Sequence, residues 1–500
     1  MPRRFTAALA TVALVVASAA AGPNPVTAAT TYVYPGCGAT IQDCVNGATS
    51  GDTILVNADD AGVAVSFSKS LTLASGDGTR HAVGAISIGD ADTPVAIVVE
   101  GFDVSLFVSA GFDTSVGSSL VMRNVHAVAG PGYAAAIELA AERSASFVLE
   151  RSAGTSTGND QAALSLFANL PAGHTATFKI IGNRLSGHGN AASGVGIGLQ
   201  MIGAGTVKAD ILNNVVWDVG RSHAGAASGI AIIPSGTIQA DVNIVGNTVE
   251  RSNTDGLQQR NTLAVGGQLR LDLFNNIFSH AKGRGIALSS GVGSTLAFRG
   301  GYNDLYANGS NDYAGQHRGP GNTAMAPGFV NRTLGQLSLV GDSPLIDRGQ
   351  VCSPGGIAMP DASGTTRLEG NGVDIGAYER GNRPVTGAVR LGGGAANHLQ
   401  GTNGDDILCG FAGNDDLLGL AGDDYLGAGN GADHGSGGPG NDRLVGGVGP
   451  DHLAGGRDGD VLCANDGVAA NDTVDGEDGF DRARTDSGDI RKSIEGLATC

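Results

Sequence analysis

The chain has 500 residues, of which 83 are Gly, and aromatic residues make up only 5%. Its formal net charge of −18 argues against nucleic acid and anionic membrane surfaces as partners, because both are negatively charged. A glycine-rich and aromatic-poor chain of this length favours a repetitive β architecture over a helical one.

The N-terminus has the features of a secretory signal peptide. Arg3 and Arg4 precede an apolar run from about Ala7 to Ala21, and small residues follow. The run is short for a membrane span, which takes about 20 apolar residues. We therefore expect residues 1–29 to be removed on export, at a cleavage position that the sequence does not select. The mature protein is expected to be secreted, extracellular and without a membrane span.

Residues 30–382 contain a loose repeat of short β-type segments that end in asparagine. The repeated asparagines are 31, 33, 29 and 27 residues apart, at Asn183, Asn214, Asn247, Asn276 and Asn303. Periods of about 20 to 50 residues are typical of solenoids. We expect one β coil per period, with the asparagines stacked in a hydrogen-bonded amide ladder. Alternating residues of the preceding strands should fill the core, namely Phe178, Ile180, Ile211, Ile244, Leu271 and Leu273.

This arrangement resembles the right-handed parallel β-helix of pectate-lyase-like proteins. Residues 40–45 and 51–56 are similar to the capping helix and first strand of that family. Residues 343–347, 361–367 and 373–379 resemble the closing segment of many secreted bacterial β-helix proteins. The resemblance covers most of residues 36–380, although its middle part is assigned mainly by composition.

One column of polar residues on this region is a candidate for chemistry. Asp218, Arg251 and His280 each stand four residues beyond a ladder asparagine, so we expect them on one face of successive coils. An acid, a cation and a base at strand spacing suit the binding or processing of an anionic sugar. The alternative is a solvated turn edge with alternating charges.

From Gly401 to Cys463 the sequence repeats every nine residues, in seven units without a gap. Position six is always aspartate: Asp406, Asp415, Asp424, Asp433, Asp442, Asp451 and Asp460. Position four is glycine in six units, including Gly404, Gly413, Gly422, Gly440 and Gly449. Position eight is leucine in six of the seven. One large apolar residue per nine suits very short strands stacked into a coil, with glycines in the turns between them.

The stacked aspartates would form columns of carboxylates about 5 Å apart, which repel one another and need a cation between them. Carboxylate and carbonyl oxygens in a flexible loop suit Ca²⁺ better than a transition metal. The repeat resembles G-G-x-G-x-D-x-U-x, the nonapeptide of RTX (hemolysin-type) calcium-binding proteins. The resemblance implies a parallel β-roll with two nonapeptides per coil, in which the position-six aspartates and loop carbonyls hold Ca²⁺ between turns.

The expected organisation is all-β: a β-helix over residues 30–382, a linker at 383–396, the roll at 397–484 and a C-terminal cap at 485–500. The fourth unit departs from the repeat at Ala428 and Gly435, and the seventh has Asp458 in place of glycine, so calcium sites there are less regular.

Six cysteines outside the cytoplasm are candidates for disulfides. Cys37 and Cys44 are close enough in sequence to staple the N-terminal edge. With two units per coil, Cys409 and Cys463 lie three coils apart, roughly 14 Å at strand spacing. That exceeds the limit of about 7 Å between bridged Cα atoms, so they are not partners. For the remaining four cysteines we expect Cys352 to pair with Cys409 and Cys463 with Cys500, although the sequence does not fix this choice.

Three functions are compatible with these features. The first is a secreted calcium-binding protein whose β-helix contacts an anionic extracellular polysaccharide. The second is a carbohydrate-active enzyme, a polysaccharide lyase or uronan C5-epimerase; the pairing of β-helix and roll resembles the secreted alginate epimerases, although their Asp-Pro-His element is absent from this chain. The third is a non-catalytic surface or matrix adhesin.

Overall fold

The computed structural model describes residues 29–90, 93–129, 135–157, 162–187, 195–220, 227–260, 262–289, 295–310, 313–314, 321–353, 361–364, 367, 372–380 and 386–498. Apart from its last residue, the predicted signal peptide lies outside these ranges. Among the described residues, no helix is both long and apolar enough to cross a membrane.

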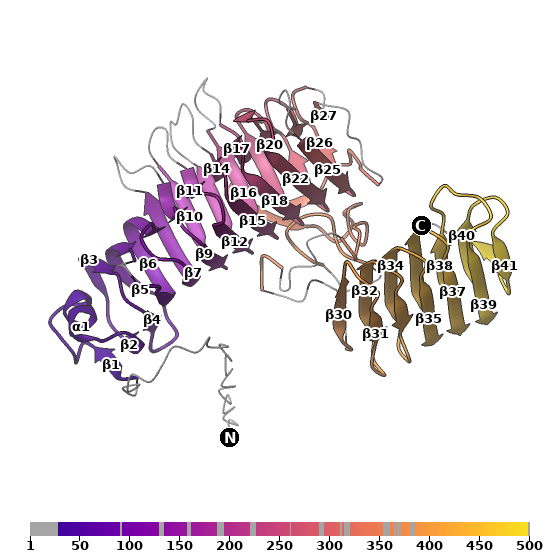
Figure 1. The fold of residues 1–500 in the computed structure, drawn as a ribbon, viewed down its shortest axis with the longest axis horizontal. Helices are drawn as coiled ribbons and strands as arrows, with labels where there is room; N and C mark the ends of the chain where they lie inside the picture. The colour runs from indigo at the N-terminus through magenta and orange to yellow at the C-terminus, as the bar shows by residue number, and fades with distance from the viewer. Residues whose placement is uncertain are drawn as a thin grey trace.

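The first 27 strands form one continuous parallel sheet that winds into a β-helix with three rows of stacked strands (Figure 1). Each coil pairs with the next in register, as in the pairing of Thr206 with Gln239 and of Ile211 with Ile244. The long strands β5, β6 and β7 turn corners and take part in more than one row.

The first row contains β1 (Thr31–Tyr34), β2 (Asp52–Val56), β4 (Leu71–Ser75), β6 (Ala96–Phe112), β7 (Ser118–Ala129), β9 (Ala145–Glu150), β12 (Thr175–Ile181), β15 (Thr206–Leu212), β18 (Gln239–Val245), β22 (Gln268–Phe274) and β25 (Thr295–Gly301). The second row continues from β7 through β10 (Ala153–Ser156), β13 (Arg184–Gly187), β16 (Val215–Val219), β19 (Thr248–Ser252), β23 (Ile277–Ser279) and β26 (Asp304–Tyr306). The third row contains β3 (Asp60–Phe67), β5 (His81–Ile88), β8 (Ala135–Ala141), β11 (Ala162–Leu170), β14 (Ile197–Gly203), β17 (Ile230–Gly236), β20 (Leu257–Gln259), β21 (Thr262–Leu263), β24 (Ile286–Ala287) and β27 (Tyr313–Ala314).

The asparagine ladder is present at the corner between the first and second rows. The side-chain amide of Asn247 donates to the carbonyl of Ile211 at 2.8 Å, and its Oδ1 accepts the backbone N–H of Asn214 at 2.9 Å. The same two bonds recur at the other rungs, and all five predicted asparagines are fully buried. A sixth rung at Asn322 was not predicted, because it follows Asn303 by only 19 residues.

The interior of the helix is apolar, as the alternation predicts. The six predicted core residues, Phe178, Ile180, Ile211, Ile244, Leu271 and Leu273, are all fully buried. Phe147 and Phe178 pair in register on neighbouring coils and stack with ring centroids 5.3 Å apart, and Phe112 from the third row stacks on Phe147 at 5.1 Å. The pair of Phe147 and Phe178 shows that equivalent positions repeat the same environment from coil to coil.

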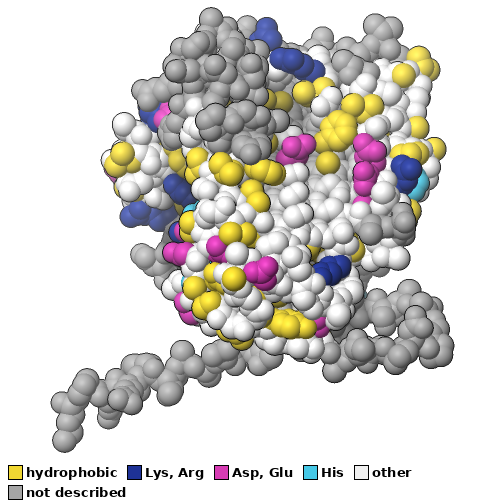
Figure 2. Space-filling model, turned by 90° about the vertical axis from the view of Figure 1, so that its left-hand side faces the viewer, with side chains coloured by type: hydrophobic (Ala, Val, Ile, Leu, Met, Phe, Trp, Pro, Cys, Tyr) yellow, Lys and Arg dark blue, Asp and Glu magenta, His cyan; other side chains and the backbone are white. Residues whose placement is uncertain are grey.

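The N-terminal end is covered by the expected capping helix, α1 (Ile41–Gly47). Thr40 and Asp43 form a capping box that satisfies free N–H groups of its first turn, while Ile41 and Val45 are buried on the first coil. The predicted Cys37–Cys44 disulfide fixes this helix to the preceding turn. Seen from this end, charged and hydrophobic side chains lie in small separate groups over the described part of the surface (Figure 2).

The closing segment contains an antiparallel hairpin, β28 (Phe329–Asn331) and β29 (Gln336–Leu339), joined by the short helix η1 (Arg332–Leu334). Its hydrophobic side chains pack on the second row, where Leu337 and Tyr378 contact Val215. Arg367 is buried, lies 3.7 Å from Glu379 and donates to the carbonyl of Asp374 at 2.9 Å. The segment therefore closes over one face of the β-helix.

The C-terminal part is a flattened coil of two parallel sheets (Figure 1). One sheet contains β30 (Val389–Gly393), β32 (Ile407–Ala412), β34 (Tyr425–Asn430), β36 (Arg443–Val448), β38 (Val461–Ala464), β40 (Arg482–Thr485) and β42 (Gly496–Leu497). The other contains β31 (His398–Gln400), β33 (Asp416–Leu418), β35 (His434–Pro439), β37 (His452–Arg457), β39 (Thr473–Asp478) and β41 (Ile490–Lys492).

From β30 to β38, neighbouring strands of each sheet are offset by 18 residues, as Ile407 pairs with Tyr425 and His434 with His452. One coil therefore contains two nonapeptides, and the position-eight leucines form a buried ladder between the sheets. The fold class, an all-β chain with a parallel β-helix followed by a β-roll, is confirmed. Strands β30, β41 and β42 lie within the segments predicted as linker and cap, so both sheets extend beyond 397–484.

A disulfide between Cys352 and Cys409 joins the closing segment of the β-helix to β32. This pairing agrees with the prediction that Cys409 and Cys463 are not partners. Cys463 also forms a disulfide, and Cys500, its predicted partner, lies outside the described residues.

The asparagine ladder predicts that removing one of its side chains greatly lowers the unfolding free energy of the β-helix. Asn247→Ala leaves the backbone N–H and the side-chain amide of Asn214 without their common acceptor inside the protein. We expect the β-helix to lose about 3 kcal/mol of unfolding free energy, since each unpaired buried group costs about 1–3 kcal/mol. Denaturant unfolding measures the loss. Asn169→Ala, at an exposed position of β11, should leave stability nearly unchanged, and equal stability of both variants would contradict the ladder's importance.

Candidate functional site

The position-six aspartates line the turns of the roll and are buried in all seven units. In each, Oδ1 accepts a backbone N–H from the preceding coil: from Ala388 at Asp406, from Asn397 at Asp415, and from an aspartate in the other five units. The N–H of Asp424 donates to Asp442 at 2.8 Å, for example, and that of Asp442 donates to Asp460 at 2.8 Å. The carboxylates therefore form two continuous columns, one along each edge of the roll.

The second oxygen of these carboxylates has no hydrogen-bond partner. This holds for Oδ2 of Asp415, Asp424, Asp433, Asp442, Asp451, Asp460, Asp472 and Asp481. Asp406 differs, because its Oδ2 accepts the N–H of Thr402 at 2.6 Å. A buried carboxylate oxygen without a partner is costly, so each column needs a proton or a cation to balance it.

The electrostatics of the columns agree with this need. Burial, together with the neighbouring carboxylates, raises the pKa of Asp424, Asp442, Asp451 and Asp460 to about 7. Without a cation these groups hold their protons far above the usual pH range of a carboxyl. The donors are hard oxygens, which is the ligand type that Ca²⁺ takes.

The position-four glycines are required by the stacking of the turns. Gly440 has φ +139°, and a Cβ there would lie 1.9 Å from the carbonyl oxygen of Gly422 in the preceding coil. Gly413, Gly422 and Gly449 share the left-handed backbone, while Gly404 does not. Any side chain at Gly440 would therefore separate the turns that hold the aspartate column.

The columns continue beyond the seventh unit. Oδ1 of Asp472 accepts the N–H of Asp451, and Oδ1 of Asp481 accepts that of Asp460, each at 2.8 Å. Both aspartates were missed as site residues because the spacing there is 21 residues instead of 18. The signal that identifies them is an aspartate at 21 residues instead of 18 after both Asp451 and Asp460.

The irregular fourth unit is accommodated without breaking the column. Ala428 is buried in the same core as the leucines, and Gly435 faces Leu444 and Leu453 where the other units carry leucine. Asp433 keeps both its backbone bond and its unpaired oxygen. Irregular residues in this unit therefore change the core and leave the carboxylate in place.

On the β-helix, the predicted column of Asp218, Arg251 and His280 is brought together as expected. Arg251 contacts Asp218 through two atoms, at 2.7 and 2.9 Å. His280 does not contact either of them directly, and its Nδ1 lies 3.2 Å from Oε2 of Glu250. Glu250 is fully buried and connects the column, a role the sequence did not reveal.

The closing segment covers this column. Arg332 of η1 lies 2.8 Å from Glu250 and donates to Nε2 of His280 at 2.8 Å. Because arginine only donates, His280 accepts at Nε2 and carries its proton on Nδ1, facing Glu250. Arg251 also donates to the backbone carbonyl of Arg332. These contacts tie the closing segment to two neighbouring coils. A catalytic role for the column stays a prediction.

Comparisons with known proteins agree with the geometry of the roll. Residues 391–426 and 427–462 match the family model of the RTX calcium-binding nonapeptide repeat. The chain is thus a parallel β-helix protein that carries RTX calcium-binding nonapeptide repeats, and calcium is the cofactor of its roll. A search of curated proteins finds no match.

Among solved structures, the chain is similar to pectate lyase Pel9A, with 12% identity, a TM-score of 0.36 and coverage of 71% of this chain and 98% of that one. It is also similar to AlyGC, an alginate lyase of the PL6 family, with 11% identity, a TM-score of 0.21 and coverage of 94% and 76%. Neither likeness bears on the activity of this chain.

Replacing one column aspartate by asparagine distinguishes the effect of its charge from the effect of its hydrogen bond. Asp442→Asn keeps the acceptor for the N–H of Asp424 and removes the buried charge. The calcium concentration at half-saturation should rise about tenfold or more, as measured by calorimetric titration. In EDTA the variant roll should melt at a higher temperature than wild type, because the desolvated charge is gone.

Asp416→Asn is the matched control, since this carboxylate lies on the outer face of the roll and contacts His398. It should leave calcium binding unchanged. Identical calcium titrations of the two variants would contradict the assignment of calcium to the buried column.

The raised pKa values predict that calcium reverses the pH dependence of the roll. A carboxyl whose pKa rises on folding binds protons more tightly in the folded state, so the metal-free roll loses stability as pH rises from about 4 toward 7. Calcium needs the ionised form, so its stabilisation grows over the same range. In EDTA, limited proteolysis should cut the roll faster well above pH 7 than well below it, with cleavage of the β-helix as internal reference. If the roll is also cut faster well above pH 7 than well below it in saturating calcium, this account is contradicted.

Proposed function

We propose that the protein is exported and that its roll folds when it meets calcium outside the cell, while the β-helix contacts an anionic extracellular polysaccharide. The observation that carries the proposal is the double column of buried aspartates, eight of which have one carboxylate oxygen without a hydrogen-bond partner. A ligand that binds only the folded form stabilises it by mass action, and millimolar extracellular calcium supplies such a ligand. The chain can thus stay loose in the roll before export and become rigid afterwards.

Two features support export. The N-terminal sequence has a basic start followed by a short apolar run, as in signal peptides. The disulfides Cys37–Cys44 and Cys352–Cys409 suit an oxidising compartment. The second disulfide also joins the β-helix to the first coils of the roll, so folding of the roll fixes its position beside the β-helix.

A polysaccharide lyase or C5-epimerase is the second candidate, and one contact favours it. His280 is partly exposed, and its Nδ1 faces the buried carboxylate of Glu250, an arrangement that can orient an imidazole base. Arg332 occupies the other ring nitrogen, however, so this side chain must move before His280 can accept a proton. A non-catalytic adhesin, in which the column only anchors the closing segment, fits the same contacts without such movement.

The proposed function predicts calcium-dependent retention on acidic polymers. The full chain should co-sediment with polygalacturonate or alginate gels in calcium, and much less after EDTA treatment with the gel cross-linked by another cation. A neutral glucan gel is the control. Equal retention in EDTA, or equal retention on the neutral gel, would contradict the proposal.

Product analysis on the same polymers separates the enzyme from the adhesin. A lyase generates unsaturated ends and an epimerase changes the C5 configuration, whereas an adhesin leaves the polymer intact. If activity is present, His280→Ala and Arg251→Ala should abolish it when the column is catalytic. Full activity of both variants would exclude this column as the catalytic site.

A further inference from the structure

A groove lies where the end of the β-helix meets the outer face of the roll. It consists of two adjoining cavities of about 670 and 550 Å³ that share Gln350, Tyr425, Val445 and Gly447. One wall comes from the last coils and closing segment of the β-helix, and the other from β34 and β36 of the roll. The Cys352–Cys409 disulfide spans the same junction.

The smaller cavity is lined by two arginines from neighbouring strands of the β-helix. Arg299 binds the fully buried Asp272 through two bonds of 2.7 Å, and Arg270 lies 3.0 Å from the same carboxylate. Each arginine side chain is nevertheless 47% exposed. Asp272 thus holds both guanidinium groups in place, and their outer N–H donors stay available for a second acceptor.

The larger cavity continues this pattern. It is lined by Arg348 and Arg443, with Asp347 as the one carboxylate of its described lining. The whole groove therefore presents four arginines and one aspartate, and four positive against three negative charges when Asp241 and Asp272 behind them are included. In a chain with 48 acidic and 30 basic residues, this local excess of positive charge favours an anionic ligand.

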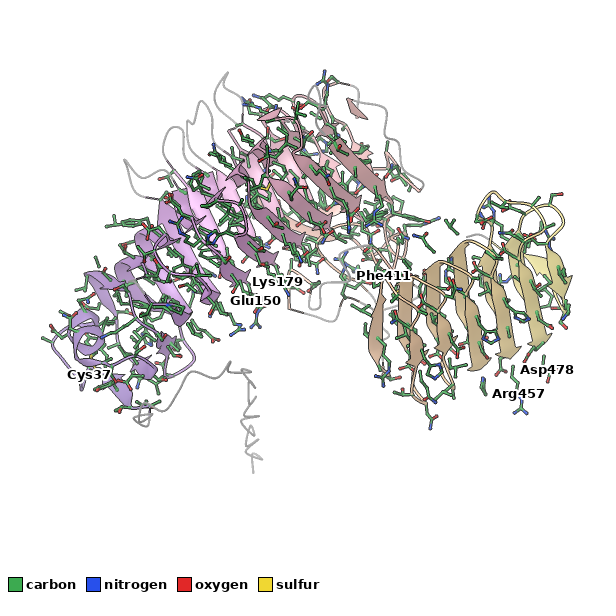
Figure 3. All side chains as sticks on the ribbon, viewed as in Figure 1. Cys37, Glu150, Lys179, Phe411, Arg457 and Asp478 are labelled. Carbon is green, nitrogen blue, oxygen red and sulfur yellow. A yellow bond between two sulfur atoms is a disulfide. The ribbon has the colours of Figure 1, made fainter. Side chains whose placement is uncertain are left out.

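Four aromatic residues also line the groove. Tyr302 and Tyr425 line the larger cavity, and Phe274 and Phe411 line the smaller one, in a chain with only 5% aromatic residues. Phe411 lies on the side of the roll that faces the β-helix (Figure 3). It has φ +71° at a position that Gly429 fills in the next coil, a backbone conformation that is strained for a residue with a side chain. Part of this strain is offset by packing against the junction.

We propose that this junction groove binds an acidic saccharide, a chain that carries carboxylates on hydroxyl-rich rings. Planar guanidinium groups match carboxylates through paired N–H bonds, and tyrosine and phenylalanine rings give flat apolar surfaces for sugar rings. Asn465, Gln350 and Thr323 supply polar groups for hydroxyls. The inference rests on the proposed function, and it locates the polysaccharide contact at the junction instead of at the column of Asp218, Arg251 and His280.

The groove makes saccharide binding depend on calcium through the fold. Tyr425 directly follows Asp424, and Arg443 directly follows Asp442, so one wall of the groove is built on the turns that need a cation. When the roll loosens, Tyr425 and Arg443 lose their fixed positions, while Arg270 and Arg299 stay on the β-helix. Calcium therefore assembles the site, and it need not touch the saccharide.

Calorimetric titration of the full chain with tetragalacturonate in saturating calcium tests the groove. Arg443→Ala and Tyr425→Ala should weaken binding about tenfold or more, since a hydrogen bond to a charged group contributes about that much. Arg482→Ala is the matched control, because Arg482 lies in the same outward column of the sheet, two coils beyond Arg443 and outside the groove. Equal affinity of Arg443→Ala, Arg482→Ala and wild type would overturn the proposal, as would equal binding of neutral cellotetraose.

Hydrogen exchange of residues 401–463 in calcium shows whether each variant keeps a folded roll. Arg299→Ala tests the wall of the groove that belongs to the β-helix, but it also removes two hydrogen bonds from the buried Asp272. Arg443→Ala tests the wall that belongs to the roll without that side effect. If the wild-type roll gains protection in calcium but tetragalacturonate does not bind, the groove proposal fails and the calcium function stands. If the roll gains no protection in calcium, the proposed function itself fails.

Discussion

Both halves of the molecule depend on one bond: a buried side-chain oxygen in a turn that accepts the backbone N–H of the equivalent residue one coil earlier. In the β-helix the oxygen belongs to asparagine, as at Asn247, and in the roll it belongs to aspartate, as at Asp442. Each such bond fixes the register of two coils. Repeated along a turn, it converts a chain of short strands into a straight solenoid.

The difference between the two side chains determines how each half is stabilised. The second polar group of asparagine is a donor, which finds a backbone carbonyl within the same corner, so the ladder of the β-helix is complete without any ligand. The second group of aspartate is an acceptor with a charge and finds no donor. The same architecture is therefore self-supporting in one half and dependent on a cation in the other. Aspartate in place of asparagine at the turn position therefore makes the stability of the roll depend on calcium.

Strict repetition is what made most of this structure predictable from sequence. The asparagine ladder, the leucine ladder and the aspartate columns each place one residue type in one environment, so the period alone identifies them. Asp472 and Asp481 were not predicted as site residues, because three extra residues precede them and they no longer fit the 18-residue spacing of the columns. Glu250 lies next to Arg251 in the sequence and is expected near the column, but its connecting role was not predicted. Its partner Arg332 comes from the closing segment, about 80 residues later, and no local pattern links the two. The junction groove depends on how two solenoids meet, which neither repeat encodes by itself.

The central claim is that calcium neutralises the aspartate columns and thereby folds the roll. Hydrogen exchange of the full chain, measured during a calcium titration with magnesium as the control, tests it most directly. The account predicts that amides of residues 401–463 become protected together with calcium and not with magnesium, while those of the asparagine ladder are protected throughout. Equal protection of residues 401–463 in EDTA, magnesium and calcium would contradict it.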